Sequence, residues 1–226
     1  MPEQIIKIPS DAIKRIGLYY RIIMDAQEVI SSEQLSELTG LGAAQIRKDL
    51  TYFGQFGTPG KGYKVDQLKK ELAQILGINR PWDVALVGIG NLGKALVSYQ
   101  GFKNQGFQMS LIFDNNPSKI GQEYQGVPIR STAELGEALK TKNIQMAVIA
   151  VPAEEGPSVA NQLIEGGIKA ILNFAPCCLK VPKNVKLINI DMAIEFSRLS
   201  YYLTQATEHT IDEENENILL KKEVIT

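Results

Sequence analysis

Three glycines follow an apolar run near the middle of the chain, in the stretch VALVGIGNLGKAL between Val84 and Leu96. Their spacing, Gly88-x-Gly90-x-x-Gly93, suits a sharp turn from a strand into a helix. Gly88 permits the turn, Gly90 lets the backbone approach a pyrophosphate because it has no Cβ, and Gly93 lets helix and strand pack closely. The helix N-terminus then offers N–H groups to the anion. We expect a pyrophosphate site at Gly88, Ile89, Gly90, Asn91, Leu92 and Gly93.

A carboxylate lies at the end of the next predicted strand. Asp114 follows Gly93 by about 20 residues, the separation at which dinucleotide-binding folds place the acid that accepts both ribose hydroxyls. Because this carboxylate would repel a 2′-phosphate, the pattern predicts NADH or NAD+ as the cofactor. Two plainer interpretations stay open. The glycines could form a tight βα turn that binds nothing, and Asp114 could be a turn or helix-capping residue before Asn115.

Two further strand ends, IAVP (Ile149–Pro152) and NFAP (Asn173–Pro176), belong to the same predicted sheet. Ligands of doubly wound sheets bind outside the carboxyl ends of the strands. Asn173 has an amide that could hydrogen-bond a carboxamide or a ribose. The candidate cofactor contacts are therefore Val151, Pro152, Asn173 and Phe174. The same residues are equally typical of ordinary strand terminators.

Groups that could catalyse a reaction are scarce. The single histidine, His209, lies in an acidic segment far from every predicted strand end, and no base or metal-ligand cluster accompanies the glycine loop. A substrate domain would need roughly another hundred residues. The adjacent Cys177 and Cys178 are more typical of small apolar residues beside a sheet than of a redox switch. We therefore predict no enzymatic activity and no metal.

The elements that must position these residues begin after residue 82, where short β-rich runs alternate with helical runs. That alternation predicts βαβ units and a parallel sheet. A doubly wound, Rossmann-like α/β domain is expected over residues 81–191, followed by a last apolar helix over 192–207, with Ile194, Leu199 and Tyr202, and an acidic tail over 208–226. The expected strands are Asp83–Val87, Gln108–Asp114, Gln145–Val151, Ala170–Phe174 and Lys186–Asp191.

Residues 1–80 have helical periodicity instead. Apolar spacings of three and four predict a first helix, and Ser31 with Gln34 forms a capping box that opens a second. A third helix follows the turn Thr39–Gly42, and a fourth spans about Val65–Leu76. The glycine-punctuated segment between the last two suggests a short hairpin. The apolar stripe of the first helix consists of Ile13, Ile16, Tyr20, Ile23 and Met24, the second helix carries Leu35 and Leu38, and Ile46, Leu50 and Phe53 of the third are expected to face inward.

Three helices followed by such a hairpin indicate a winged helix-turn-helix domain that binds DNA. From Ala43 to Lys70 there are six basic and two acidic residues, a net charge of +4. Arg47 on the third helix could contact a guanine or a phosphate, and Lys61 suits a phosphate or a narrow minor groove. The alternatives are a solvated helix face and a plain surface loop. The candidate DNA contacts are Gln45, Arg47, Lys48, Thr51, Tyr52, Lys61, Gly62 and Tyr63.

The composition of the whole chain indicates where in the cell the protein is expected and excludes some classes of protein. Its 226 residues carry 24 Lys and Arg against 25 Asp and Glu, so no overall basic field indicates nucleic acid. No apolar run approaches a membrane span, and the N-terminus lacks the features of a signal peptide. Two adjacent cysteines make no disulfide framework. We expect a cytoplasmic protein.

Four segments together resemble the Rex family of bacterial redox-sensing transcriptional repressors, and the likeness spans about Ile5 to Leu203. The resemblance implies a homodimer whose winged helices bind an inverted-repeat operator. It also implies that NADH releases the DNA, that NAD+ competes without release, and that the last helix is swapped between subunits. The segments are SSEQLSELTGLGAAQIRKDLTYFGQFGTPGKGYKV, VGIGNLGKAL, FDNNPSKIG and ILNFAPCCLKVP.

The resemblance also implies a signal-coupling element. Asp191 matches an acidic residue that can exchange partners between Tyr99 and Arg21, although a static interface network is the alternative. The chain departs from the family at Asn115, which replaces a more usual apolar residue, at the cysteine pair and in its acidic tail. Two rival functions stay open: a small NAD-dependent dehydrogenase, and a regulator that binds CoA or FAD.

Overall fold

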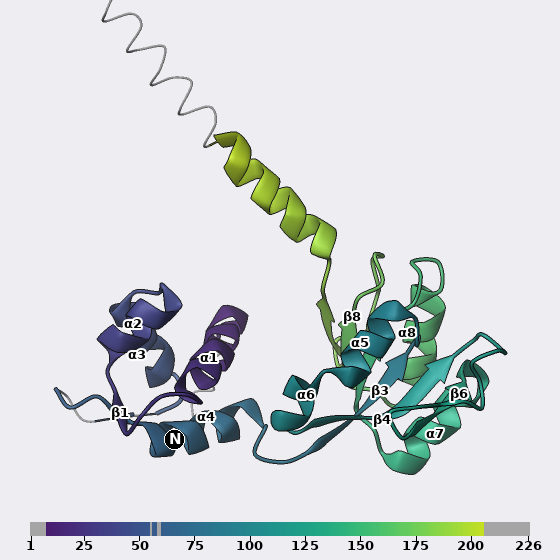
Figure 1. The fold of residues 1–226 in the computed structure, drawn as a ribbon, viewed down its shortest axis with the longest axis horizontal. Helices are drawn as coiled ribbons and strands as arrows, with labels where there is room; N and C mark the ends of the chain where they lie inside the picture. The colour runs from purple at the N-terminus through teal and green to yellow at the C-terminus, as the bar shows by residue number, and fades with distance from the viewer. Residues whose placement is uncertain (1–7, 55, 58–59, 206–226) are drawn as a thin grey trace, which may run out of the picture. The chain divides into compact units, whose positions relative to one another are not determined.

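The computed structural model describes residues 8–54, 56–57 and 60–205 (Figure 1). The chain divides into two compact units: a helical unit, Met1–Trp82 with Gln100–Gln108, and a sheet unit, Asp83–Tyr99 with Met109–Thr226. Each unit has its own hydrophobic core. Thr58 and Pro59 of the predicted hairpin, His209 and the acidic tail lie outside the described residues.

The helical unit consists of helices and one small antiparallel strand pair. Ile30 pairs with Tyr63 and Val29 with Lys64. The strand that precedes the fourth predicted helix is therefore joined to a strand between the first two helices, which the sequence pattern does not indicate. The elements are α1 (Ser10–Ile23), β1 (Val29–Ile30), α2 (Ser32–Thr39), α3 (Ala43–Thr51), β2 (Tyr63–Lys64), α4 (Val65–Leu76) and α6 (Gln100–Asn104).

The buried face of α1 differs from the predicted one. Ala12, Ile16, Tyr19 and Ile23 are buried, at spacings of four, three and four. The predicted inward residues Ile13 and Met24 are 47% and 49% exposed, and Tyr20 is only partly buried. The prediction was wrong at Ile13 and Met24, because α1 carries two neighbouring apolar stripes and periodicity alone does not separate them. Tyr20 packs against the core of the helical unit.

The helix-turn-helix segment largely follows its sequence. The capping box of Ser31 and Gln34 is present, and Gly40 ends α2 in the left-handed conformation, with φ at +70°. Leu35 is fully buried, whereas Leu38 is 63% exposed. Ile46 and Leu50 of α3 are buried as expected, and α4 has the predicted bounds.

The sheet unit holds seven strands in the order β5-β6-β4-β3-β7-β8-β9. The pairs β3–β7, β4–β6, β7–β8 and β8–β9 are parallel, and β5–β6 is antiparallel, which confirms the doubly wound α/β fold. The strands are β3 (Trp82–Val87), β4 (Phe107–Asp114), β5 (Glu123–Tyr124), β6 (Val127–Ser131), β7 (Met146–Ile149), β8 (Ala170–Asn173) and β9 (Lys186–Asn189). The helices are α5 (Asn91–Ser98), η1 (Thr132–Glu134), α7 (Leu135–Lys142) and α8 (Gly156–Glu165).

All five predicted strands are present, with small differences at their ends, whereas β5 and β6 were missed. β5 has only two residues, and β6 contains Pro128, which argues against a strand in a sequence pattern. The core lies on strands and covering helices alike, with fully buried Ala85, Phe113 and Ile149 packed with Leu139 and Leu163. This packing brings the carboxyl ends of β4, β3 and β7 next to one another.

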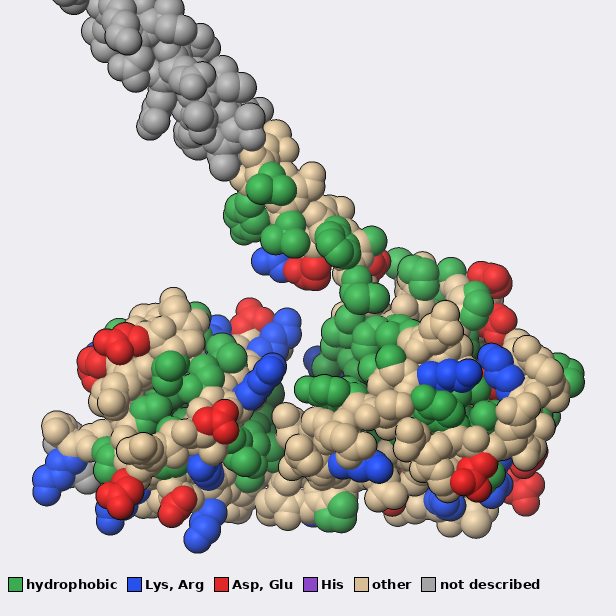
Figure 2. All heavy atoms as spheres, viewed as in Figure 1, with side chains coloured by type: hydrophobic (Ala, Val, Ile, Leu, Met, Phe, Trp, Pro, Cys, Tyr) green, Lys and Arg blue, Asp and Glu red, His purple; other side chains and the backbone are tan. Residues whose placement is uncertain are grey.

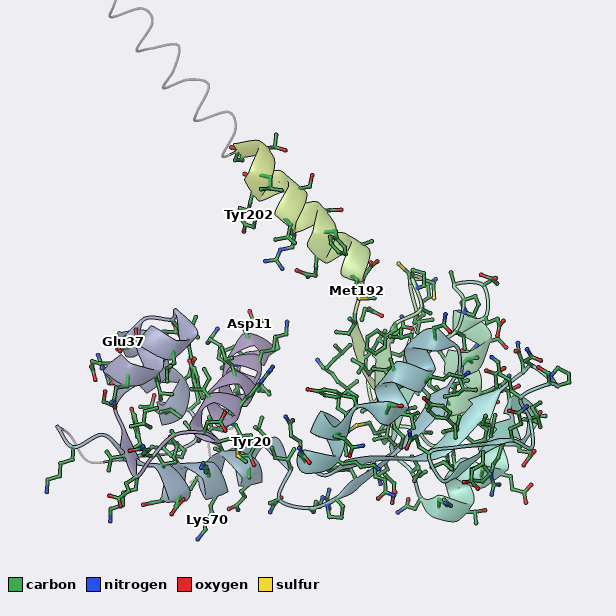
Figure 3. All side chains as sticks on the ribbon, in the orientation of Figure 1. Asp11, Tyr20, Glu37, Lys70, Met192 and Tyr202 are labelled. Atoms are coloured by element: carbon green, nitrogen blue, oxygen red, sulfur yellow. The ribbon has the colours of Figure 1, made fainter. Side chains whose placement is uncertain are left out.

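A helix over residues 192–205 ends the described chain. Its apolar side chains are exposed: Phe196 is 71% exposed and Leu199 58%. Figure 2 shows hydrophobic side chains gathered along it, and Figure 3 labels Met192 and Tyr202 near its two ends. An apolar surface of this extent is typical of an interaction site. Among the described residues, no helix has the length and apolar character that crossing a membrane requires.

Candidate dinucleotide site and nucleic-acid interface

The loop from β3 into α5 is shaped by its glycines. Gly88 has φ at +96°, and a Cβ there would collide with the carbonyl oxygen of Ala150. A Cβ on Gly93 would collide with the carbonyl oxygen of Gly88, so α5 can approach the loop only with glycine at this position. Gly90 caps α5, and a Cβ there would meet nothing within 4 Å. Gly88 and Gly93 thus have their predicted structural roles, and the surface over Gly90 is open.

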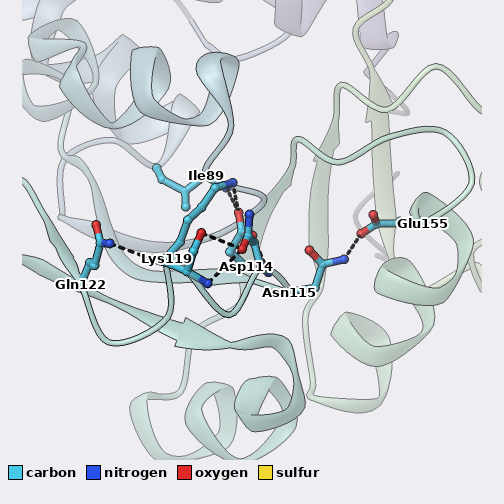
Figure 4. A network of polar contacts seen from close by, with 8 residues as sticks. Ile89, Asp114, Asn115, Lys119, Gln122 and Glu155 are labelled. Carbon is cyan, nitrogen blue, oxygen red and sulfur yellow. Dashed lines mark hydrogen bonds and ion pairs between the residues drawn. The ribbon is translucent and has the colours of Figure 1, made fainter.

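Asp114, at the end of β4, lies beside this loop and is 5% exposed (Figure 4). Its Oδ2 accepts the Ile89 N–H at 2.9 Å and Lys119 Nζ at 3.0 Å, and its Oδ1 accepts the Asn116 N–H at 2.9 Å. Burial acts to raise the pKa of Asp114, but the bonds from Asn116, Lys119 and Ile89 outweigh it and lower the pKa. Asp114 is therefore a carboxylate held against the glycine loop.

Lys119 is a site residue that the sequence reasoning missed. Its ammonium group pairs with Asp114, with side-chain exposures of 32% and 6%. After β4 the chain reverses direction, so that Lys119 contacts Asp114. In this turn Asn116 Oδ1 accepts the Ser118 N–H at 2.9 Å. A basic residue shortly after a strand-end acid, across an Asn-Pro turn, was the available signal. Charge at the predicted ribose position thus comes from an ion pair, not from a lone carboxylate.

The candidate residues at the ends of β7 and β8, on the other side of β3, differ in exposure and in hydrogen bonding. Val151 is half-buried and Pro152 exposed, just beyond β7. Asn173 is 1% exposed: its Nδ2 donates to Ala175 O and Asn189 Oδ1, and its Oδ1 accepts the Ala175 N–H. Asn173 therefore holds the NFAP turn together. Phe174 is half-buried, and contact of these four residues with a cofactor stays a prediction.

A buried network joins the predicted recognition helix α3 to α1. The Asp49 side chain is fully buried and accepts four hydrogen bonds: Arg15 Nε at 2.6 Å and Nη2 at 2.7 Å, Tyr19 Oη at 2.8 Å and Gln45 Nε2 at 2.8 Å. Burial acts to raise the pKa of Asp49, but these bonds outweigh it and lower the pKa. Gln45, predicted to reach DNA, is thus also a structural partner, and the sequence reasoning missed Asp49.

Arg47 of α3 and Lys61 of the glycine-rich segment border one hollow. Arg47 Nη1 donates to Ser32 Oγ at 2.7 Å and Glu33 Oε1 at 2.9 Å, so its guanidinium lies against the start of α2. Lys48 is exposed, and the Thr51 hydroxyl donates to its carbonyl oxygen. The hollow has a volume of about 800 Å³ and is lined in part by Ser32, Arg47, Thr51, Lys61 and Gly62.

One predicted DNA contact, Tyr63, is largely buried. Tyr63 is 8% exposed and packs in the core of the helical unit, because its pairing with Ile30 turns the ring inward. Gly62 has φ at +76°, and a Cβ there would lie 2.8 Å from the Ile30 carbonyl oxygen, so glycine is required for this pairing. Lys61 is exposed and Tyr52 half-buried. DNA contact by these residues stays a prediction.

Comparison with protein families matches both units. Residues 7–51 match the model described as putative DNA-binding protein N-terminus, and residues 79–177 match the model described as CoA binding domain. The redox-sensing transcriptional repressor Rex of Desulfitobacterium hafniense is 43% identical over 200 residues, which cover 87% of this chain and 95% of that protein. The Rex repressor of Syntrophobacter fumaroxidans is 42% identical over 203 residues, 88% of this chain and 97% of that one. This chain belongs to the Rex family.

Solved structures of a Rex-family repressor agree with this assignment. RSP in complex with beta-NAD+ and operator DNA is 33% identical, with a TM-score of 0.85, over 90% of this chain and 96% of that chain. RSP in complex with beta-NADH is 32% identical, with a TM-score of 0.81, over 92% and 99% of the two chains. The Rex likeness thus extends across both units, and the family resemblance seen in the sequence is confirmed.

The three predicted coupling residues of this Rex-family chain lie on different elements. Asp191 Oδ1 accepts the Ala193 N–H at 2.9 Å, so Asp191 caps the last helix. Tyr99, just after α5, is 56% exposed, and Arg21 is exposed on α1 of the helical unit. An exchange of partners among the three stays a prediction.

The two adjacent cysteines of this Rex-family chain differ in exposure. Cys177 is half-buried and packs against Gly156 at the start of α8, as expected of a small apolar residue, whereas Cys178 is exposed. Among residues 8–54, 56–57 and 60–205, no group of three or more His, Cys, Asp or Glu side chains is placed to hold a metal ion.

Proposed function

We propose that this chain is a redox-sensing transcriptional repressor that binds inverted-repeat operator DNA as a homodimer and leaves it when NADH binds. One observation carries the proposal: a single chain of the Rex family combines a basic helix-turn-helix with a glycine loop and a strand-end carboxylate. The RSP complexes, one with beta-NAD+ and operator DNA and one with beta-NADH, support both ligands. Because a repressor acts on the genome, we place the chain in the cytoplasm.

The dinucleotide site would hold NADH through three features of this chain. The pyrophosphate would lie over Gly90 at the N-terminus of α5, where N–H groups and the helix dipole favour an anion. Asp114, already ionised, would accept the ribose hydroxyls. The nicotinamide would then lie toward the loops after β7 and β8, near Val151 and Phe174.

The two redox states differ in the charge of the nicotinamide ring, which is neutral in NADH and positive in NAD+. We propose that the neutral ring packs near Met192 and Ala193 of a swapped last helix and favours a closed dimer, whereas the charged ring costs desolvation there or recruits Asp191. A difference of about 3 kcal/mol between the open and closed forms shifts their ratio more than a hundredfold. An Asp191→Ala variant that discriminates NADH from NAD+ as before would remove Asp191 from this account.

A gel shift tests the proposed function directly. The full chain is mixed with an inverted-repeat DNA fragment, and NADH is titrated at fixed NAD+. We expect NADH to release the DNA and NAD+ alone to leave it bound. The same release with both cofactors, or DNA retained at saturating NADH, would contradict the proposal.

The rival functions predict different measurements. We propose that the chain does not turn NADH over, since its relatives are named repressors and the carboxylate beside the glycine loop, Asp114, is held by hydrogen bonds from Ile89, Asn116 and Lys119. Steady oxidation of NADH with any substrate would favour a dehydrogenase. The CoA binding domain match makes CoA a necessary comparison. We expect CoA not to displace NADH, because Asp114 would face its ribose phosphate.

A further inference from the structure

A hydrogen bond bridges two loops at the carboxyl edge of the sheet. Asn115 follows β4, Glu155 immediately precedes α8, and Asn115 Nδ2 donates to Glu155 Oε2 at 2.9 Å (Figure 4). The strands before these loops, β4 and β7, lie on either side of β3. The bridge therefore crosses the strand that runs into the glycine loop.

The position of the bridge relates it to one end of the cofactor. Asn115 is the residue after Asp114, which we assign to the ribose next to adenine. The dinucleotide reaches this ribose from the glycine loop, where Ile89 N–H bonds Asp114. The base, joined to the same ribose, must therefore extend past Asp114 toward the residues that follow it. Asn115 is exposed and Glu155 half-buried, so both can meet a ligand.

The two side chains match the edge of adenine chemically. An ionised Glu only accepts hydrogen bonds, and an Asn amide both donates and accepts. Adenine offers a 6-amino donor between two ring-nitrogen acceptors, and carboxylates and amides commonly read such edges. In the free chain the Glu155 carboxylate accepts a hydrogen bond from the Asn115 amide. When adenine binds, its 6-amino group can take the place of that donor.

We propose that Asn115 and Glu155 determine specificity for the adenine base of the dinucleotide. Glu155 accepts the 6-amino group, Asn115 donates to a ring nitrogen, and these bonds replace the one between the two side chains. The inference rests on the proposed function, because it needs a dinucleotide bound at Asp114. It adds a polar base-reading pair to the ribose and pyrophosphate contacts.

The test compares NADH with reduced nicotinamide hypoxanthine dinucleotide, which carries a 6-oxo group in place of the 6-amino group. Binding of each to the full chain is followed by nicotinamide fluorescence. We expect the unchanged chain to prefer NADH about tenfold, since the 6-oxo oxygen cannot donate to Glu155 and the protonated ring N1 of hypoxanthine cannot accept from Asn115. Glu155→Gln, whose amide can donate to the 6-oxo group, should bring the ratio close to one. The matched control, Glu154→Gln, alters an exposed neighbour and should keep the preference.

The possible outcomes separate this inference from the proposed function. Equal binding of both dinucleotides by the unchanged chain, or a preference that persists in Glu155→Gln, overturns the base-reading pair. A bridge that only joined the loops would change both affinities together and leave their ratio intact. If Glu155→Gln does not fold, Asn115→Val, a change at an exposed position, must lower the ratio of NADH affinity to hypoxanthine dinucleotide affinity instead. Failure of the unchanged chain to bind NADH at all counts against the proposed function.

Discussion

Asp114 and Lys119 form an ion pair beside the glycine loop, at the predicted ribose position. The carboxylate is ionised, nearly buried and bonded to the glycine loop, while the ammonium group is partly exposed beside it. A 2′-phosphate on the ribose would meet repulsion from Asp114 and attraction from Lys119. We therefore predict that any preference for NADH over NADPH depends on the balance of the two charges rather than on the acid alone.

Removal of Lys119 should sharpen that preference. In Lys119→Met the carboxylate becomes a lone negative charge, so we expect NADPH affinity to fall about tenfold more than NADH affinity, the equivalent of one charge-assisted hydrogen bond. Fluorescence titration with both cofactors measures the change, with Lys140→Met on the exposed surface of α7 as control. An unaltered NADPH/NADH ratio would show that Lys119 plays no part. Equal affinities in the unchanged chain would contradict the assignment of Asp114.

The recognition helix α3 depends on a buried charge for its attachment to α1. Asp49 accepts bonds from Arg15, Tyr19 and Gln45, and the partners Arg15 and Tyr19 both come from α1. Bonds to a fully buried carboxylate set the rotation of α3 about its own axis. The face that carries Arg47 and Lys48 is consequently positioned by a residue that DNA cannot touch.

This attachment makes the helical unit sensitive to acid. The folded pKa of Asp49 lies below its ordinary value of 3.8, so the stabilisation is complete above that value and is lost as the pH falls toward the lower folded pKa. We expect Asp49→Asn to lose about 3 kcal/mol of unfolding free energy at pH 7 and to show a shallower decline below pH 3.8. Denaturant unfolding across pH measures both, with exposed Asp66→Asn as control. An identical decline in Asp49→Asn would exclude Asp49 as its source.

The glycine-rich segment before α4 should contact phosphate through Lys61. In Lys61→Ala we expect weaker operator binding and a salt dependence whose slope is smaller by about one. Gel shifts at several salt concentrations give the slope, and Lys140→Ala in the sheet unit should leave it unchanged. Full operator affinity with the original slope would place Lys61 outside the interface.

At the scale of the whole molecule, the last helix carries a surface of exposed apolar side chains. Ile194, Phe196 and Leu199 are more than half exposed, and the Rex family resemblance implies that a second subunit covers this helix. A dimer formed in this way would link the dinucleotide sites to the paired DNA-binding units that an inverted repeat requires.

A charge on this helix should separate the subunits. In Phe196→Glu we expect dimer affinity to fall at least about a hundredfold, because burial of the new carboxylate would lack a partner. Analytical ultracentrifugation at two protein concentrations measures the change, and Glu195→Gln on the same helix is the control. A Phe196→Glu chain that stays dimeric would show that the interface lies elsewhere.

Local patterns in the sequence determined a large part of this protein. Residues a few positions apart predicted four features: the glycine loop, the strand-end Asp114, the capping box of Ser31 and Gln34, and the bounds of α4. Each of these features depends on backbone geometry over one turn or one strand, which residue type and spacing control directly. The βαβ alternation then limited the fold to a doubly wound sheet.

Tertiary structure decided which side chains meet across long separations. Asp49 bonds Arg15 from 34 positions away, and Asn115 bonds Glu155 across 40. It also placed Tyr19 rather than Tyr20 in the core. Such pairings depend on how whole elements pack, because two apolar stripes or two polar residues look alike in a sequence until another element covers one of them. The sequence by itself therefore specified the glycine loop and its strand-end acid, and only the packed structure specified the ion pair beside that acid, the attachment of α3 and the bridge between Asn115 and Glu155.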